Sequence, residues 1–331
     1  MSGNLFLQYD AADTGARPLP ANSTFWVSPA VVLATPDGNY TVGQPATIDV
    51  QVSLMSPAAY EIINVEVWVC DPTTVAGPST ALPPFQGATA QQLTLTGFYV
   101  PPNPSQAIST LPVIQVTGFA PYPGISSLPG GHCCLIANCY GTTGDGTADG
   151  ADLNEVAAAN LPNLVQTDPH VAQHNIFADA TPPGSQIKVI NFPFRAATPL
   201  SLGTEQVRLE ITETPPAQLR PILRPILSPG LSPGLSPGLS PALRQLQGAK
   251  FTGLPVEISE RPVRSIGLIG LPNEGRVVEL ELEANRSQVL TATVELDPAE
   301  TPGAAHAFDI VQRDATGRVQ GGFRLVTLVG H

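Results

Sequence analysis

Short runs in which apolar and polar residues alternate, separated by proline and glycine, recur along almost the whole 331-residue chain. This period-two pattern is typical of half-buried strands, and no long run has the helical period. Strands of this length and spacing usually pack as two facing sheets. The sequence therefore predicts an all-β protein of antiparallel β-sandwiches. The predicted strands are 46–54, 63–72, 91–101, 111–119, 132–139, 168–177, 186–194, 205–213, 251–258, 275–284, 287–296, 307–314 and 321–329.

A chain of this length exceeds what one core usually holds, so two sandwiches in tandem are expected. The boundary is placed near residue 180, at the turn signal Thr181-Pro-Pro-Gly. The predicted organisation is an extended N-terminal arm over 1–24, an acidic sandwich over 25–180 and a second sandwich over 181–331. Within the second sandwich, Asn285-Arg286 separates two alternating runs, which predicts a hairpin.

The N-terminal arm has an apolar segment that can dock on a sheet edge of a neighbouring subunit. Sheet edges accept an added strand because their backbone groups are unpaired. We therefore expect the arm to serve in assembly. Its docking residues are Leu5, Phe6, Leu7 and Tyr9.

Inside the second sandwich, residues 220–243 repeat a tetrapeptide with proline at every fourth position and leucine two residues later. Such spacing excludes a helix or a central strand. The sequence predicts a loop insertion over about 215–247. Two hypotheses remain for it: a simple expansion of a tolerated loop, or a leucine-rich arm used in assembly.

Charge is distributed unevenly, because no Lys or Arg lies between Arg17 and Lys188 while eleven Asp or Glu do. A domain without basic residues cannot neutralise phosphates, which excludes nucleic acid as its partner. Such a surface can attract cations or a basic protein surface, or can simply keep the chain soluble. No membrane span and no signal peptide are evident, so assembly in the cytoplasm or non-classical export is expected.

One segment concentrates metal-ligating residue types, namely His132, Cys133, Cys134 and Cys139. Zinc sites usually use ligand pairs with different spacing. On a strand, Cys133 points with Leu135 and Ala137, whereas Cys134 points with Ile136 to the opposite face. Both faces are apolar. The pattern therefore favours a central strand with buried cysteines over a zinc site.

A second candidate is the acidic loop 141–155, which resembles the first half of an EF-hand calcium loop but has Val156 where the pattern needs Glu. A calcium site and a solvated acidic turn are both retained as hypotheses. Calcium is the one cofactor considered, and its candidate ligands are Asp145, Asp149, Asp152 and Glu155. His170 and His174 are flanked by extended-chain signals, so a helical two-histidine metal pair is not predicted. Because no catalytic motif occurs, the chain is not expected to be an enzyme.

Four segments carry a resemblance to a known family, namely Phe25-Trp26-Val27-Ser28-Pro29, Val67-Trp68-Val69-Cys70-Asp71-Pro72, Gly131-His132-Cys133-Cys134-Leu135-Ile136-Ala137 and Asp168-Pro169-His170-Val171-Ala172-Gln173-His174-Asn175-Ile176. Together they resemble bacterial immunoglobulin-like modules of the CARDB (cell-adhesion-related) type. This resemblance covers 25–180 well and 186–329 loosely. It implies two immunoglobulin-like β-sandwiches in tandem and a non-catalytic adhesion, scaffold or particle-surface protein.

The order of Cys70 after Trp68, with Cys134 on a later strand, resembles the inter-sheet bridge of immunoglobulin-type sandwiches. A Cys70–Cys134 disulfide is one hypothesis, and buried thiols in a reducing compartment are the other. The leading functional hypothesis is a non-enzymatic subunit or surface component of a filament or particle, partnered by itself or by other subunits. The alternative is an adhesion module that binds calcium or carbohydrate.

Overall fold

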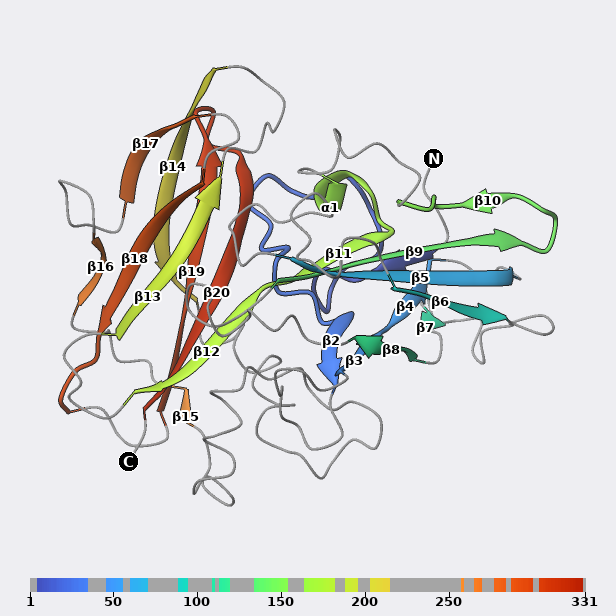
Figure 1. Cartoon of the computed structure of the whole chain (residues 1–331), viewed down its shortest axis with the longest axis horizontal. Coiled ribbons are helices and arrows are strands. Elements are labelled where there is room, and N and C mark those ends of the chain that lie inside the picture. The colour runs from blue at the N-terminus through green and yellow to red at the C-terminus, as the bar shows by residue number, and fades with distance from the viewer. Residues whose placement is uncertain are drawn as a thin grey trace.

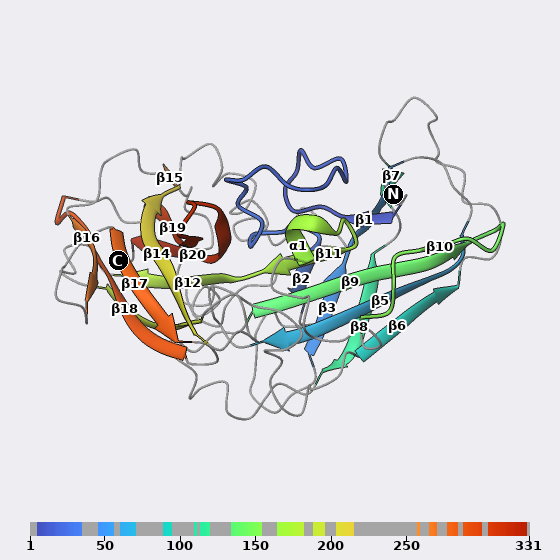
Figure 2. The ribbon, with the colours of Figure 1, turned by 90° about the horizontal axis from the view of Figure 1, so that it is seen from above.

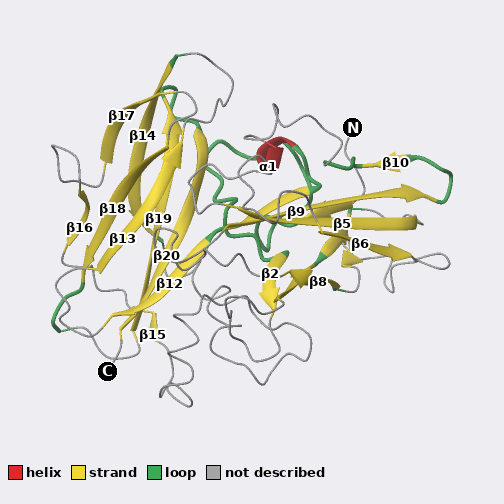
Figure 3. Ribbon diagram, viewed as in Figure 1, coloured by secondary structure: helices red, strands yellow, loops and turns green. Residues whose placement is uncertain are grey.

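The protein consists of two β bodies that lie side by side (Figure 1). Within the described residues, nearly all of the regular structure is strand and the one helix is the short α1 (Leu164–Thr167), which confirms the all-β prediction (Figure 3). The repeat insertion lies outside the described residues. The computed structural model describes residues 5–34, 46–55, 60–70, 89–94, 109–110, 113–119, 134–153, 164–181, 188–195, 203–214, 257–258, 265–269, 277–283, 287–299 and 304–329.

The first sandwich is built around a five-stranded sheet with strand order β10-β9-β5-β6, to which β11 adds by pairing with β9. Two three-stranded sheets, β1-β4-β7 and β2-β3-β8, lie beside it in the same body (Figure 2). Both of them contribute residues to the same apolar core. The strands are β1 (Leu5–Leu7), β2 (Val31–Ala34), β3 (Ala46–Val50), β4 (Val52–Leu54), β5 (Tyr60–Cys70), β6 (Thr89–Thr94), β7 (Ser109–Thr110), β8 (Ile114–Phe119), β9 (Cys134–Thr143), β10 (Ala148–Asp149) and β11 (Val171–His174).

One predicted strand, 46–54, becomes two strands that belong to different sheets. The break is at Gln51, whose backbone N–H donates to the carbonyl of Ala30 at 2.8 Å. Strand β3 then pairs with β2 and β8, whereas β4 pairs with β1 and β7. Alternation of side chains continues through such a break, so the sequence pattern did not reveal it.

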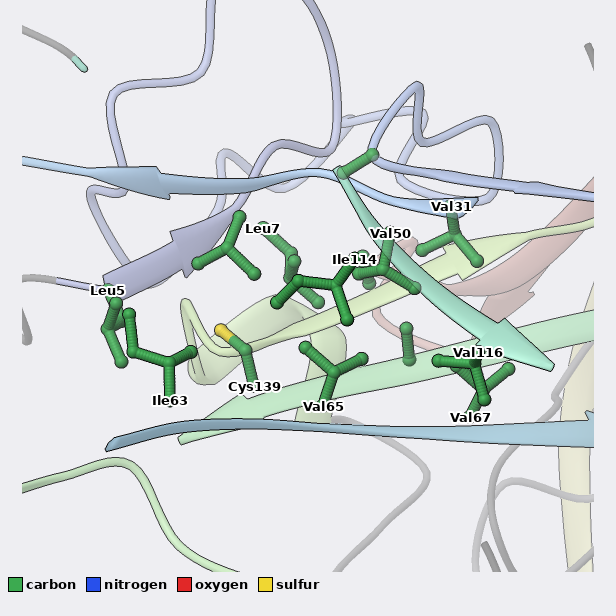
Figure 4. Close-up of a cluster of buried hydrophobic side chains, with 14 of the residues drawn as sticks. Leu5, Leu7, Val31, Val50, Ile63, Val65, Val67, Ile114, Val116 and Cys139 are labelled. Atoms are coloured by element: carbon green, nitrogen blue, oxygen red, sulfur yellow. The ribbon is translucent and has the colours of Figure 1, made fainter. Parts of the chain in front are cut away.

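The core of the first sandwich gathers alternate residues of β5 and β9 (Figure 4). Ile63, Val65 and Val67 of β5 are fully buried, and Cys139 and Ala137 oppose the last two across the strand pair. This is the arrangement that period-two alternation predicts.

The N-terminal strand β1 belongs to this same core. Leu5, Phe6 and Leu7 are 0% exposed and pair with β4 in antiparallel register. Burying each such side chain contributes about 1.5–3 kcal/mol. The extended arm is therefore not confirmed: residues 5–24 are part of the first sandwich, because their apolar side chains fill a core of their own chain.

The second sandwich pairs a six-stranded sheet, in the order β12-β20-β19-β14-β17 with β15 on β19, with a three-stranded sheet, β13-β18-β16. Described pairings are antiparallel except β12 with β20 and β15 with β19. The strands are β12 (Ile176–Thr181), β13 (Lys188–Arg195), β14 (Thr204–Glu213), β15 (Glu257–Ile258), β16 (Ser265–Ile269), β17 (Val277–Glu283), β18 (Ser287–Glu295), β19 (Ala304–Asp314) and β20 (Val319–Val329).

The predicted hairpin around Asn285-Arg286 is wrong. Strand β17 pairs with β14, whereas β18 pairs with β13 and β16 in the other sheet. Val278 and Leu282 of β17 share one core with Ala292 and Val294 of β18. Two consecutive amphipathic strands can pair with each other in one sheet, or they can lie in opposite sheets and face each other across a core. Apolar and polar residues alternate in the same way in both arrangements, so the sequence pattern could not distinguish them.

Candidate functional site: the junction of the two sandwiches

The two sandwiches share a buried apolar cluster, which we call the junction core. Phe25 and Trp26 form an edge-to-face pair in it, with ring centroids 5.3 Å apart. The first sandwich supplies most of the cluster, and β19 and β20 each supply one valine. The junction core comprises Leu19, Phe25, Trp26, Trp68, Cys134, Ile136, Leu153, Val165, Val171, Val311 and Val319.

A buried ion pair lies beside the junction core. Arg324 of β20 opposes Asp309 of β19, and its guanidinium donates from Nε to Oδ1 at 3.0 Å and from Nη2 to Oδ2 at 2.8 Å. The two side chains are only 1% and 9% exposed. Trp26 Nε1 of the first sandwich donates to Asp309 Oδ1 at 3.0 Å, and Thr214 Oγ1 donates to Oδ2 at 2.9 Å. The Asp309 carboxylate therefore accepts four hydrogen bonds, one of them from across the junction.

The chain crosses from one sandwich to the other at Asn175, between β11 and β12. Its backbone N–H donates to Trp26 O at 2.8 Å, and its own carbonyl accepts from Arg324 N at 3.0 Å. Its side-chain Nδ2 donates to Gly322 O at 3.2 Å. A Cβ on Gly322 would lie 2.8 Å from Trp26 Cε2, so only glycine lets this ring approach β20. The predicted boundary near residue 180 falls at the far end of β12.

A second buried polar cluster lies in the first sandwich and centres on His170. His170 Nε2 donates to Asp149 Oδ1 at 3.0 Å, and Nδ1 donates to Asp168 Oδ1 at 2.6 Å. The other oxygen of Asp149 accepts from the Tyr60 hydroxyl at 2.5 Å and from the backbone N–H of Leu5 at 2.8 Å. The cluster thus joins four separate parts of the chain and anchors the N-terminal strand.

These contacts shift the pKa values of the cluster in opposite directions. Burial disfavours the imidazolium of His170, but the two carboxylates outweigh it and raise the His170 pKa to about 9. Burial disfavours the Asp149 and Asp168 carboxylates, but the other contacts together outweigh it and keep both pKa values below their ordinary value. These contacts are the hydrogen bonds and charge of His170 for both acids, with the hydrogen bonds from Tyr60 and Leu5 N for Asp149 and the charge of Arg17 for Asp168. At neutral pH the cluster is a cation between two anions.

The structure separates the acids predicted to bind calcium. Asp145 is exposed in the β9–β10 turn, where it accepts from Thr147 N at 3.1 Å. Asp149 is in the His170 cluster, and Asp152 accepts from the Tyr140 hydroxyl at 3.2 Å. Glu155 lies outside the described residues. In the part of the chain that is described, no three His, Cys, Asp or Glu side chains group as metal ligands do. The calcium site stays a prediction.

Strand β9 places its residues as predicted for a strand covered on both faces. Leu135, Ala137 and Cys139 face the first core, whereas Cys134 and Ile136 face the junction core. All five side chains are buried, and Cys134 and Cys139 carry thiols. Cys133 and His132 lie outside the described residues.

The cysteines of the predicted bridge lie on neighbouring strands of one sheet. In the register of β5 and β9, Cys70 is directly opposite Cys134. Opposed residues of an antiparallel pair have Cα atoms about 4.5–5.5 Å apart, within the range that disulfides span. The bridge stays a prediction, and its geometry would be cross-strand within one sheet.

The predicted arm residues come together at the N-terminal strand. Leu5, Phe6 and Leu7 form β1, and Leu7 N donates to Pro169 O at 2.9 Å. Tyr9 packs against the junction core, and the Arg17 guanidinium carbon lies 5.7 Å from its ring centroid.

Sequence reasoning missed the residues that join the sandwiches. Trp26 was noted only for the family resemblance, and Asp309 and Arg324 lie on predicted strands without being singled out. One signal was available: Asp309 and Arg324 are charged residues within otherwise apolar strands. Once the pairing of those strands is known, two opposite charges that face each other indicate a buried ion pair. Without the register of β19 and β20, nothing indicated that they meet.

Comparison with known proteins finds no matching family model and no matching curated protein sequence. The CARDB resemblance is therefore not confirmed. Among solved structures, a putative carbohydrate binding protein from Bacteroides ovatus is 7% identical with a TM-score of 0.27, over 47% of this chain and 35% of that one. A bacterial adhesin from Mobiluncus mulieris with intramolecular disulfide, isopeptide and ester cross-links is 8% identical with a TM-score of 0.24, over 91% of this chain and 96% of that one.

The structure of CBD12 from CALX1.2 is 12% identical with a TM-score of 0.19, over 87% of this chain and 82% of that one. All three TM-scores are below 0.5, so functional inference rests on the chain's own residues. Within the described part of the chain, no helix is long and apolar enough to span a bilayer.

Proposed function

We propose that this protein is a non-enzymatic structural protein, a subunit or surface component of a multimeric filament or particle. The observation that carries this proposal is the buried junction, in which Trp26 of the first sandwich hydrogen-bonds the Asp309–Arg324 ion pair of the second. His170 and Asp309, the titratable groups with the most extensive contacts, use their polar atoms in hydrogen bonds inside the protein. This supports a structural role for both residues.

A rigid junction suits an assembly subunit because it fixes the direction of each sandwich relative to the other. Domain interfaces within a chain are usually polar, and relative motion is their default. Here eleven buried apolar residues and the hydrogen bond from Trp26 to Asp309 join the two bodies, and a single run of chain continues from β11 into β12. The surfaces on either side of the junction are thereby presented at a constant geometry.

The surface we propose for contact with a partner is the β17 edge. Within the described residues, β17 has one strand neighbour, β14. Val277 is 43% exposed, and Glu279, Glu281 and Glu283 follow it at alternate exposed positions. An edge of this kind can be extended by a strand of another chain. Charge complementarity favours a partner strand with Lys or Arg at alternate positions.

Assembly is tested on the full chain isolated gently from cells that make it. Sedimentation velocity and negative-stain electron microscopy should show a regular multimer. Glu279→Lys with Glu281→Lys should abolish it, whereas Glu61→Lys, at an exposed position of the first sandwich, should not. A strictly monomeric native protein would refute the proposal.

The second candidate function is an adhesion module that binds calcium or carbohydrate through the 141–155 loop. The observation in its favour is that Asp145 is exposed and Asp152 half-buried in a domain without Lys or Arg from 18 to 187. Calorimetry with calcium, and a glycan array, test it. If adding calcium gives no heat of binding and no shift in melting temperature, calcium binding is ruled out. If the glycan array gives no signal, carbohydrate binding is ruled out.

A further inference from the structure

The N-terminal strand β1 is bound to the first sandwich along both of its edges. On one edge it pairs with β4. On the other, Leu5 N donates to Asp149 Oδ2 at 2.8 Å and Leu7 N donates to Pro169 O at 2.9 Å. The side chains of Leu5 and Leu7 are fully buried in the first core (Figure 4). We call the position between β4, Asp149 and Pro169 the β1 site.

Residues 5–17, which we call the flap, are held together by bonds of their own. The Asp13 carboxylate accepts from Gly15 N at 2.8 Å and from Arg17, whose Nη1 and Nη2 lie 3.1 and 3.2 Å from it. A Cβ on Gly15 would lie 3.0 Å from Phe6 Cγ, so the loop packs closely on the strand. Because these contacts are internal, the flap can bind as a preformed unit and loses little conformational freedom when it does so.

A short connection, residues 18–24, joins the flap to the rest of the sandwich. Its buried residue is Leu19, which is 8% exposed and whose N–H donates to Gln166 O at 2.8 Å. Both Pro18 and Pro20 are exposed, and proline favours extended chain. Seven residues span up to about 25 Å when extended. The connection can therefore carry the flap from its own β1 site to that of an adjacent copy.

The charge of the flap is complementary to the body that binds it. Arg17 is the sole Lys or Arg in residues 1–187, so without the flap the first sandwich has neither. Its charge is one of those that stabilise the Asp168 carboxylate. The sequence and charge that fit the β1 site are thus those of the flap itself, and a second copy of this chain is the partner that brings them.

We propose that copies of this chain exchange flaps, so that β1 of one copy occupies the β1 site of the next. This inference rests on the proposed assembly function, in which the β17 edge brings copies together and exchange then links their first sandwiches. The flap makes the same contacts in either β1 site, so the closed and exchanged forms differ in the connection 18–24 and in association. One-way exchange from copy to copy is a heterologous contact, which closes into a ring or extends into a filament.

The register of β1 and β4 supplies a reporter of exchange. Leu7 is directly opposite Val52. Its N–H points away from β4, toward Pro169 O, so the two residues form a pair without hydrogen bonds between them. Cα atoms of such pairs lie about 4.5 Å apart, within the range that disulfides span. Cysteines at these two positions can therefore form a bridge wherever β1 lies on β4.

The test uses two full-length chains produced together, one with Leu7→Cys and the other with Val52→Cys, purified as the multimer and oxidised with diamide. Each chain carries one of the two cysteines, so a bridge between positions 7 and 52 forms only when the flap of one chain occupies the β1 site of another. Peptide mass mapping should find this bridge. Denaturing gels without reductant should show a covalent dimer that is absent when each variant is produced alone.

Leu7→Cys with Val52→Cys in a single chain is the positive control, because it forms the bridge with or without exchange. Leu5→Cys and Leu54→Cys, the other such pair in the register, serve if the first pair does not fold. A multimer that shows the bridge in the control but not in the mixed chains would overturn the exchange and leave the proposed function standing. A strictly monomeric protein would refute the proposed function and the exchange with it.

Discussion

Replacing Arg324 with methionine tests how much the buried ion pair beside the junction stabilises the fold. Methionine fills much of the space of the arginine stem but removes both donors to Asp309, at 3.0 and 2.8 Å. Asp309 then keeps only the neutral donors Trp26 Nε1 and Thr214 Oγ1. Breaking a buried pair from one side usually costs about 3–5 kcal/mol, because the remaining charge is uncompensated. We expect a loss of unfolding free energy in this range.

A second substitution separates the uncompensated charge from lost packing. In Arg324→Met with Asp309→Asn, the asparagine oxygen accepts from Trp26 and its amide donates to Thr214 Oγ1. Because no buried charge remains, the double variant should recover about 2 kcal/mol of the loss. Arg208→Met is the matched control. Its contact with Glu210 is 3.5 Å long and its side chain is 48% exposed, so the change should cost about 0–1 kcal/mol.

Urea unfolding followed by tryptophan fluorescence measures all three variants, and Trp26 reports on the junction directly. A loss for Arg324→Met no larger than that for Arg208→Met would refute the assignment. A double variant no more stable than the single one would show that the loss comes from packing and not from the charge.

Three other changes test the remaining parts of the structure. Phe6→Ala should cost about 3–5 kcal/mol of unfolding free energy in a denaturant titration, because the side chain is fully buried; a loss below 1 kcal/mol would favour a free arm. His170 is charged in the folded state up to about pH 9, so its contribution to stability is complete below its ordinary pKa of 6.5 and is lost as the pH rises through 9. About 3 kcal/mol of unfolding free energy should disappear over this range. His170→Asn should show no such fall in melting experiments. Under a small-molecule disulfide oxidant, unfolding and refolding should produce a Cys70–Cys134 bridge detectable by peptide mass mapping, and its absence would leave the two cysteines as packing residues.

Several features of the fold followed from local alternation. The strands β5, β9, β14 and β19 were predicted close to their observed positions, because each has at least one buried row of apolar residues at alternate positions in the sequence. The burial of both faces of β9 was also predicted, from the apolar character of both Cys134-Ile136 and Leu135-Ala137. Alternation fixes the face of a residue once its strand is known.

Other features depended on which strands meet. Three features of the fold leave the period-two pattern unchanged. Strands β17 and β18 lie in opposite sheets, the predicted strand 46–54 breaks at Gln51, and Leu5–Leu7 pack in the first core. Glu66 and Asn138 are likewise 72 residues apart in sequence, and nothing local indicated that the amide of one would donate to the buried carboxylate of the other.

The sequence by itself determined the class of the fold, the faces of its strands and the absence of basic residues between Arg17 and Lys188. Within that span, histidine and neutral groups are therefore the available partners for a buried acid. Only the tertiary structure decided which partner each acid received: His170 for Asp149, the neutral donors Asn138 and Leu153 N for Glu66, and in the second sandwich Arg324 for Asp309. The reason is physical, since side-chain orientation follows from the backbone of one strand, whereas the compensation of a buried charge depends on strands that come together only on folding.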